Sequence, residues 1–326
     1  MKIIRTIQKN GTLEPRASAI IRAIPKDVLC HELHAVKHPL TVYGTSISRI
    51  TTAWLKIFPL YESLFLEVAC NLELSKRVEL LEAYEVLLYR LNEHIDACHE
   101  VLRSLRPPIP GKIYETHARF LWETKLPGFR AFKDSIHNGY REQHIGIIVN
   151  EMKHSSAQLR SIVGRTEKSV VLGYFLDGPH PRGALGPNSR LHKNYRGMYT
   201  AFSFSRDMLM HFWWIYQISE AVSRCVEMTM QSDHGLNIRE DAKDPLPHPW
   251  NDLCHKVSQL QPFFFLDECE KPYPIVICDP DKRAMSVEFQ TLRRATPYKE
   301  MDIVFTSDFP EGAGGIAMPY FVRPKR

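Results

Sequence analysis

Arg206 and His211 stand five residues apart in this chain, at the start of a long apolar stretch. A histidine that titrates near neutral pH can take or give a proton, and a guanidinium fork matches a phosphate that gains charge during reaction. The N-terminus of a helix adds a favourable dipole for the same anion. These residue types therefore fit the chemistry of phosphodiester cleavage.

The spacing of Arg206 and His211 resembles the Arg-x4-6-His motif of the HEPN superfamily, helical bundles that include many metal-independent ribonucleases. Asp207 follows the arginine, and a polar residue is often found there in the family. The resemblance covers seven residues and a helical context. It implies a homodimer with the Arg and His of both protomers at a shared cleft. It also implies that Arg206 binds the scissile phosphate of RNA and that His211 exchanges protons with the 2′-hydroxyl or the leaving oxygen. Neither a metal nor another cofactor is implied.

A loop of unusual length, residues 177 to 197, precedes this motif and is rich in positive charge. Cations and histidines on a loop suit binding of a nucleic-acid backbone, because the phosphates carry most of its charge. The only acid in this loop is Asp177. The candidate substrate-binding residues are Arg182, Arg190, His192, Lys193 and Arg196.

A non-enzymatic interpretation competes with the ribonuclease interpretation. Short motifs also match by chance, and Arg130 to His137 gives a second match that lacks the polar residue. In this alternative, His211 is a core histidine, Arg206 is a solvated residue of a first helical turn, and the bundle binds a partner chain. Catalysis requires the pair in an open cleft, whereas the alternative buries His211 among apolar groups.

Two groups of cysteine and histidine have the spacing of ligands on one helix face. Cys30, His34 and His38 recur every four residues, and four residues separate His94 from Cys98. Such pairs can hold a metal between the helices of a bundle. Cys98 also fits the apolar seam of its helix, where a buried thiol needs no metal. We therefore assign no metal to them.

The tail contains a third arrangement of candidate ligands. Asp281 after Pro280, and Glu288 two residues before Gln290, imitate the Pro-Asp and Glu-x-Lys elements of metal-dependent nucleases, whose carboxylates bind Mg²⁺. Gln290 stands where that group of enzymes has lysine. The segment around Asp281 is better explained as a hairpin turn.

The pattern of apolar residues predicts long helices first and strands afterwards. Helices are expected over residues 75 to 106, 141 to 163, and 203 or 205 to 235. Strands are expected where β-branched and aromatic residues cluster, over 169 to 176, 263 to 266, 275 to 277 and 303 to 305. The fold class is therefore mainly α, a helical bundle with long helices plus a smaller C-terminal β-rich region.

Prolines after residue 235 divide the chain, because the run Asp244 to Pro249 cannot continue a helix. We expect an α-helical bundle domain over residues 1–235, a proline-rich linker over 236–251 and a small β-rich region over 252–326. About 75 residues of short strands make a marginal domain, so this region should pack on the bundle.

Composition indicates an ordinary folded protein, since 44% of the 326 residues are hydrophobic and 24% are charged. The formal net charge of +5 equals the excess of six Lys and Arg over one acid within residues 1–26. An organelle transit segment and an arm for anionic partners are the functional explanations of that excess. Many cytosolic proteins begin in the same way without either role.

Several classes of protein are disfavoured by missing signals. The seven cysteines include no Cys-x-x-Cys pair and suit free thiols in a reducing compartment, so the cytoplasm is expected. There is no apolar run of about 18 residues, which disfavours a membrane protein. The sequence also lacks a phosphate-binding P-loop, a dinucleotide-binding glycine turn and a Gly-x-Ser-x-Gly elbow.

Overall fold

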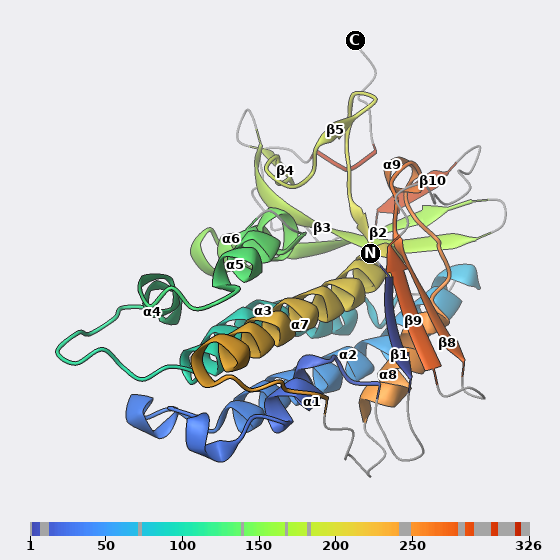
Figure 1. Ribbon diagram of the computed structural model, residues 1–326. Helices are drawn as coiled ribbons and strands as arrows, with labels where there is room; N and C mark the ends of the chain where they lie inside the picture. The colour runs from blue at the N-terminus through green and yellow to red at the C-terminus, as the bar shows by residue number, and fades with distance from the viewer. Residues whose placement is uncertain are drawn as a thin grey trace.

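The fold is mainly α-helical with a smaller β-rich C-terminal region, as the sequence predicted (Figure 1). The strands lie toward one end of the long helices α2, α3 and α7 (Figure 1). The computed structural model describes residues 2–6, 13–70, 74–137, 140–166, 169–180, 184–240, 249–279, 284–289, 301–305 and 317–320.

The helical elements differ widely in length. The α-helices are α1 (Ala17–Arg22), α2 (Pro39–Ala69), α3 (Arg77–Arg103), α4 (His117–Glu123), α5 (Phe129–His137), α6 (Gly146–His154), α7 (Phe204–His234), α8 (Pro249–Ser258) and α9 (Leu266–Cys269). Shorter turns are the 3-10 helices η1 (Lys26–Val28) and η2 (Glu32–His34) and the π-helical segment η3 (Arg141–Ile145).

Two of the predicted helices are confirmed in nearly their predicted extent. α3 buries the apolar positions that recur every three or four residues, and α7 is buried along most of its length. α7 begins after the extended residue Ser203 and ends at Gly235, whose φ of 68° is the left-handed value that glycine adopts readily.

α2 is a long helix that the sequence pattern did not indicate, and it packs along α3. Pro39 occupies its first position, where a missing amide hydrogen costs nothing, and His38 caps it by accepting the Leu40 amide at 3.2 Å. Pro59 lies inside the helix. Burial of Trp54 against His211 and Phe212 of α7, together with the packing of α2 on α3, offsets that interruption.

The strands form antiparallel sheets. The strands are β1 (Lys2–Thr6), β2 (Leu159–Arg165), β3 (Val170–His180), β4 (Ala184–Pro187), β5 (Asn194–Tyr195), β6 (Met198–Tyr199), β7 (Phe202–Ser203), β8 (Pro274–Asp279), β9 (Ala284–Phe289) and β10 (Asp302–Phe305). One sheet has the order β1-β9-β8, a second has the order β10-β2-β3-β4 with β7 beside β3, and β5 pairs with β6.

Residues 141 to 163 do not form the single helix that was predicted. α6 ends at His154, and β2 starts at Leu159. Leu159 and Ile162 fit a helical spacing, but β2 pairs with β3 on one side and β10 on the other. Those two ladders of backbone hydrogen bonds outweigh the local pattern.

Two other segments also differ from the prediction. Residues 263 to 266 do not form the predicted strand, because the Glu268 carboxylate accepts the Phe265 amide at 3.1 Å and α9 begins at Leu266. The predicted loop from residue 177 is partly sheet, since β3 continues to His180 and pairs with β4.

The sheets connect distant parts of the chain. β1, near the start of the sequence, pairs with β9, and β10, near its end, pairs with β2 of the central sheet. The boundaries at residues 235 and 252 stay predictions.

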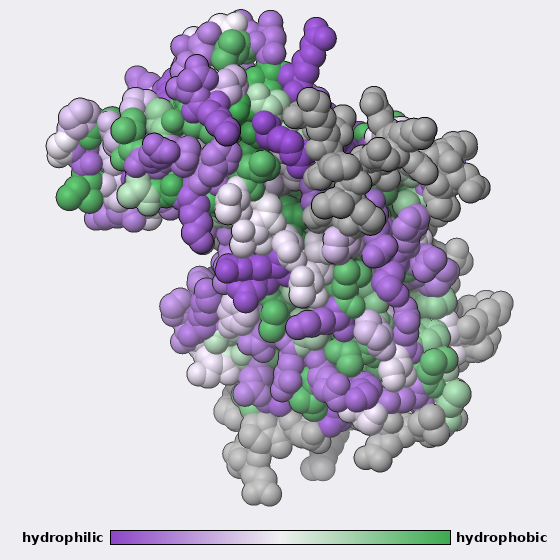
Figure 2. Space-filling model, turned by 90° about the horizontal axis from the view of Figure 1, so that it is seen from below, coloured by the Kyte–Doolittle hydropathy of each residue, from purple (hydrophilic) through white to green (hydrophobic). Residues whose placement is uncertain are grey.

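The main core lies between the helical bundle and one face of the central sheet, and a smaller cluster lies on the other face. Trp54, Trp214 and Trp250 are fully buried in the main apolar core. Ile162 and Phe175 belong to a second, smaller cluster on the opposite face of β2 and β3. On the face shown in Figure 2, apolar side chains are scattered among polar ones. Among the described helices, none has the length and apolar character needed to cross a bilayer.

Candidate functional site

Asp207 and His211 share one face of the first turns of α7, whereas Arg206 points elsewhere. His211 Nε2 lies 3.4 Å from Asp207 Oδ2, which the i, i+4 relation on a helix permits. The Arg206 guanidinium donates from Nη2 to the carbonyl oxygen of Pro272 at 3.0 Å. The two residues of the predicted motif therefore lie in different environments.

The Asp207 carboxylate is the centre of a buried polar cluster. Its Oδ1 accepts a hydrogen bond from the Tyr140 hydroxyl and lies 2.8 Å from His144 Nε2. Its Oδ2 accepts the Tyr84 hydroxyl at 2.7 Å and also the Tyr174 hydroxyl. The Asp207 cluster consists of Asp207, Tyr84, Tyr140, His144, Tyr174 and His211.

The members of the Asp207 cluster come from separate elements. Tyr84 lies in the buried seam of α3, His144 in η3, and Tyr174 on the side of β3 that faces the helices. π-helical segments often occur at functional sites, because the extra residue per turn redirects side chains. The cluster thus joins the bundle to the central sheet at the start of α7.

The electrostatics of the cluster keep a negative charge at its centre. Burial alone would raise the pKa of Asp207, but the His144 and His211 rings outweigh burial and hold that pKa well below its usual value. Burial, together with the Asp207 charge, raises the pKa of Tyr84 and Tyr174 well above the usual range. These hydroxyls therefore remain protonated and act as donors.

The centre of the cluster is closed to solvent in a single chain. The exposed fraction is 3% for Asp207 and 0% for His211. A carboxylate offers about four lone-pair positions, and five polar side chains already surround this one. These side chains compensate the buried charge of Asp207, and His211 lies away from the surface.

Sequence reasoning identified Asp207 only as the polar residue after an arginine. The partners Tyr140, His144 and Tyr174 were missed, because nothing in their local sequence distinguishes them from other buried residues. One signal was present. An acid followed directly by an apolar helical run needs several donors when it is buried, and Tyr84 occupied an apolar seam position.

Two exposed cations of the loop before α7 are paired with separate acids. Arg190 forms an ion pair with Glu151 of α6. Arg196 Nη2 lies 3.3 Å from Glu270 Oε1, beyond the sheet. Lys193 is exposed, and Arg182 lies outside the described residues. The described cations of this loop therefore do not converge on His211.

His192 has a structural role in the sheet. It is fully buried, and its Nε2 accepts the Leu176 amide at 3.0 Å. Burial lowers its pKa to about 3, so the ring is neutral at physiological pH. The ring therefore satisfies a backbone amide within β3.

The Cys30–His38 group does not converge. Both ring nitrogens of His34 are engaged, with Nε2 2.7 Å from the Arg106 carbonyl oxygen and Nδ1 accepting from Arg103 Nε at 3.1 Å. His38 caps α2. Across the part of the chain that the structure describes, no group of three or more His, Cys, Asp or Glu is arranged to hold a metal ion.

Of the two acidic candidates in the tail, Glu288 is described, and it forms an ion pair with a lysine. Glu288 on β9 is 3.5 Å from Lys2 of β1, an ion pair across the sheet. Asp281 lies outside the described residues. All seven cysteines are free thiols.

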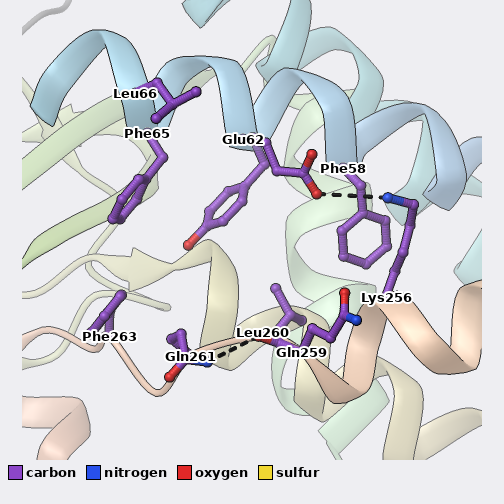
Figure 3. A pocket seen from close by; sticks show the side chains of 10 residues that line it. Phe58, Glu62, Phe65, Leu66, Lys256, Gln259, Leu260, Gln261 and Phe263 are labelled. Carbon is purple, nitrogen blue, oxygen red and sulfur yellow. Dashed lines mark hydrogen bonds and ion pairs between the residues drawn. The ribbon is translucent and has the colours of Figure 1, made fainter. Parts of the chain in front are cut away.

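An apolar groove opens between α2 and the end of α8, with a volume of about 400 Å³ (Figure 3). Phe58 and Phe65 of α2 point toward Leu260 and Phe263 on the opposite wall (Figure 3). The Phe65 and Phe263 rings are nearly parallel, at 12°, with centroids 6.1 Å apart. We refer to this feature as the α2–α8 groove.

The rim of the α2–α8 groove is polar. Lys256 Nζ lies 3.7 Å from Glu62 Oε1, and both side chains remain substantially exposed, at 40% and 61%. Gln259 and Gln261 add exposed amides on the α8 side (Figure 3). A few polar groups around an apolar floor are typical of ligand and peptide sites.

No family model, curated protein or solved structure matches the chain. The HEPN resemblance, RNA as the substrate and the homodimer stay predictions.

Proposed function

We propose that the chain is a non-enzymatic interaction protein whose helical bundle binds an amphipathic helical segment of a partner chain in the α2–α8 groove. The observation that supports this proposal is an apolar floor that opens to solvent between two helices. The residues of the ribonuclease motif offer less support for catalysis, because His211 is fully buried and Arg206 contacts a backbone carbonyl.

The shape of the groove favours a short helix. The α2 wall uses positions three and four residues apart from Phe58 to Leu66, a rise of about 12 Å. Two turns of an α-helix span about 11 Å. A helix that places apolar residues at the same spacing would bury them against Phe65 and Leu260, which is the usual helix-in-groove mode.

The charges at the rim favour a partner with both signs on its polar face. Glu62 and Lys256 keep a large exposed fraction although they contact each other. A basic residue of the partner can approach Glu62, and an acidic residue can approach Lys256. Such rim contacts contribute more to orientation and association rate than to affinity.

Fluorescence anisotropy with a designed probe tests this function. The probe is a fluorescein-labelled peptide of two to three helical turns, with leucines on one face and Lys and Glu on the other. A scrambled peptide of identical composition lacks the apolar face. We expect the parent protein to bind the amphipathic probe and to ignore the scrambled one.

Two variants locate the binding. Gln261→Trp fills the groove from an exposed position, and Gln231→Trp places the same side chain on an exposed site at the end of α7. We expect at least about tenfold weaker binding for Gln261→Trp, equivalent to about 1.4 kcal/mol, and no change for Gln231→Trp. Equal binding by both variants, or equal binding of both peptides by the parent, would refute the proposal.

A further inference from the structure

A serine and a histidine are hydrogen-bonded between α2 and α3, away from the Asp207 cluster and the α2–α8 groove. Ser46 Oγ lies 2.9 Å from His94 Nδ1. On the other side of the ring, His94 Nε2 lies 3.6 Å from Cys98 Sγ. A proton on Nε2 that points to the sulfur leaves Nδ1 as the acceptor of the Ser46 hydroxyl.

Ser46 faces a second pocket, of about 530 Å³, between α2 and α3. Its side chain is half-buried, whereas His94 is fully buried behind it. Arg49, almost one turn along α2, lines the same pocket. So do Arg90 of α3, which is ion-paired with Glu93, and the carboxylates of Asp96 and Glu100. A hydroxyl oxygen held by a histidine and open to a pocket with guanidinium groups has the arrangement of an activated nucleophile.

The protonation state of His94 suits a base but sets a limit on its strength. Burial lowers the pKa of His94 to about 4, so the ring is neutral at neutral pH. In the tautomer with its proton on Nε2, the Nδ1 lone pair accepts the Ser46 hydroxyl. Among the described residues, no carboxylate contacts this ring to stabilise its protonated form. The reaction should therefore be slow and confined to esters with good leaving groups.

We propose that Ser46 is an acyl-accepting nucleophile for activated carboxylic esters bound in the α2–α3 pocket, with His94 as its general base. Ser46 Oγ forms a bond to the acyl carbon while its proton moves to His94 Nδ1. The bond to the leaving alkoxide or phenoxide breaks, and that oxygen takes the proton from His94. Water then hydrolyses the acyl-serine, so no oxidant or other co-reactant is required. Arg49 supplies positive charge for the oxyanion that forms during attack.

The test uses 4-nitrophenyl acetate with the full chain at neutral pH. Release of nitrophenolate is followed by absorbance, and the acylated residue is located by mass spectrometry of proteolytic peptides. The variants are Ser46→Ala, His94→Gln and, as a matched control, Ser48→Ala, which removes an exposed hydroxyl from the same helix. Circular dichroism and thermal unfolding establish that each variant is folded. Ser46→Cys serves as a second variant, since a thiol at the same place keeps a nucleophile.

We expect acetyl on Ser46 in the parent and in Ser48→Ala, and none at this position in Ser46→Ala. General-base assistance contributes about 100-fold or more, so folded His94→Gln should acylate Ser46 slower by that factor. If His94→Gln does not fold, comparison of Ser46→Cys with the parent decides, because acylation must then appear on residue 46 in both proteins. Acetyl found only on lysines, or Ser46 acylated at an equal rate in folded His94→Gln, would overturn the proposal. A purely structural serine would give no label in the parent.

Discussion

Glu268 should make the stability of this protein fall as the pH rises toward neutrality. Its side chain is 1% exposed and connects α9 to the start of α7, because both carboxylate oxygens lie 3.2 Å from the Ser203 amide nitrogen. One of these oxygens also accepts the Phe265 amide. Glu268→Gln keeps the shape and an acceptor oxygen while it removes the titration.

The size of the effect comes from the pKa of Glu268. Burial is the largest influence and raises this pKa from 4.5 to about 7, against the opposing effect of Arg206. At about 1.4 kcal/mol per pH unit, the difference corresponds to about 3 kcal/mol. The folded protein holds the proton more tightly than the unfolded chain. The favourable contribution is therefore complete below about pH 4.5 and is lost as the pH rises through about 7.

Urea unfolding at about pH 5 and pH 8 measures this contribution, because other titrating groups change equally in parent and variant. We expect the parent to lose about 3 kcal/mol more than Glu268→Gln between the two pH values. Glu270→Gln, at the exposed residue that directly follows the same short helix, is the matched control and should follow the parent. If Glu268→Gln and the parent change in parallel, Glu268 does not have a raised pKa in the folded protein.

Three further outcomes are expected. Asp207→Asn should destabilise the protein by about 3 kcal/mol or more in urea unfolding, because it leaves several buried donors without their charge; an unchanged midpoint would contradict the compensating role of the cluster. The pKa of His94 is about 4 in the folded protein against a usual 6.5, so the free energy of unfolding should fall as the pH drops through this interval. His94→Gln should remove about 3 kcal/mol of that loss in the same assay. A mixed RNA pool in EDTA should remain intact, as judged by gel electrophoresis. Cleavage that disappears in both Arg206→Ala and His211→Ala would instead support the ribonuclease prediction.

The elements that could be predicted from sequence are those whose own spacing determines their burial. α3 and α7 have many apolar positions at helical intervals, and Gly235 ends α7 by adopting a positive φ. α2 escaped detection because Pro59 interrupts its pattern and because serine and threonine are frequent in its first half. Its stability comes from packing on α3, which local sequence does not report.

The candidate site was only partly predictable for a similar reason. The segment that contains Arg206 and His211 does contribute to a buried polar cluster, but the central residue of that cluster is Asp207. The partners of Asp207 come from elements far apart in the sequence. Tyr174 reaches Asp207 only because β3 turns one face toward the bundle. The α2–α8 groove was not predicted either, since one of its walls belongs to the helix that the pattern missed.

The pairing of β1 with β9 has a consequence for how the chain folds during synthesis. Lys2 lies opposite Glu288, so the first strand has no partner until almost all of this sequence has left the ribosome. At roughly 5–20 residues per second, that wait is on the order of tens of seconds. Ile3, which ends in the core, stays unprotected during this time. Closure of this sheet is therefore a late step, and a nascent chain stalled before residue 284 would expose β1 to chaperones and proteases.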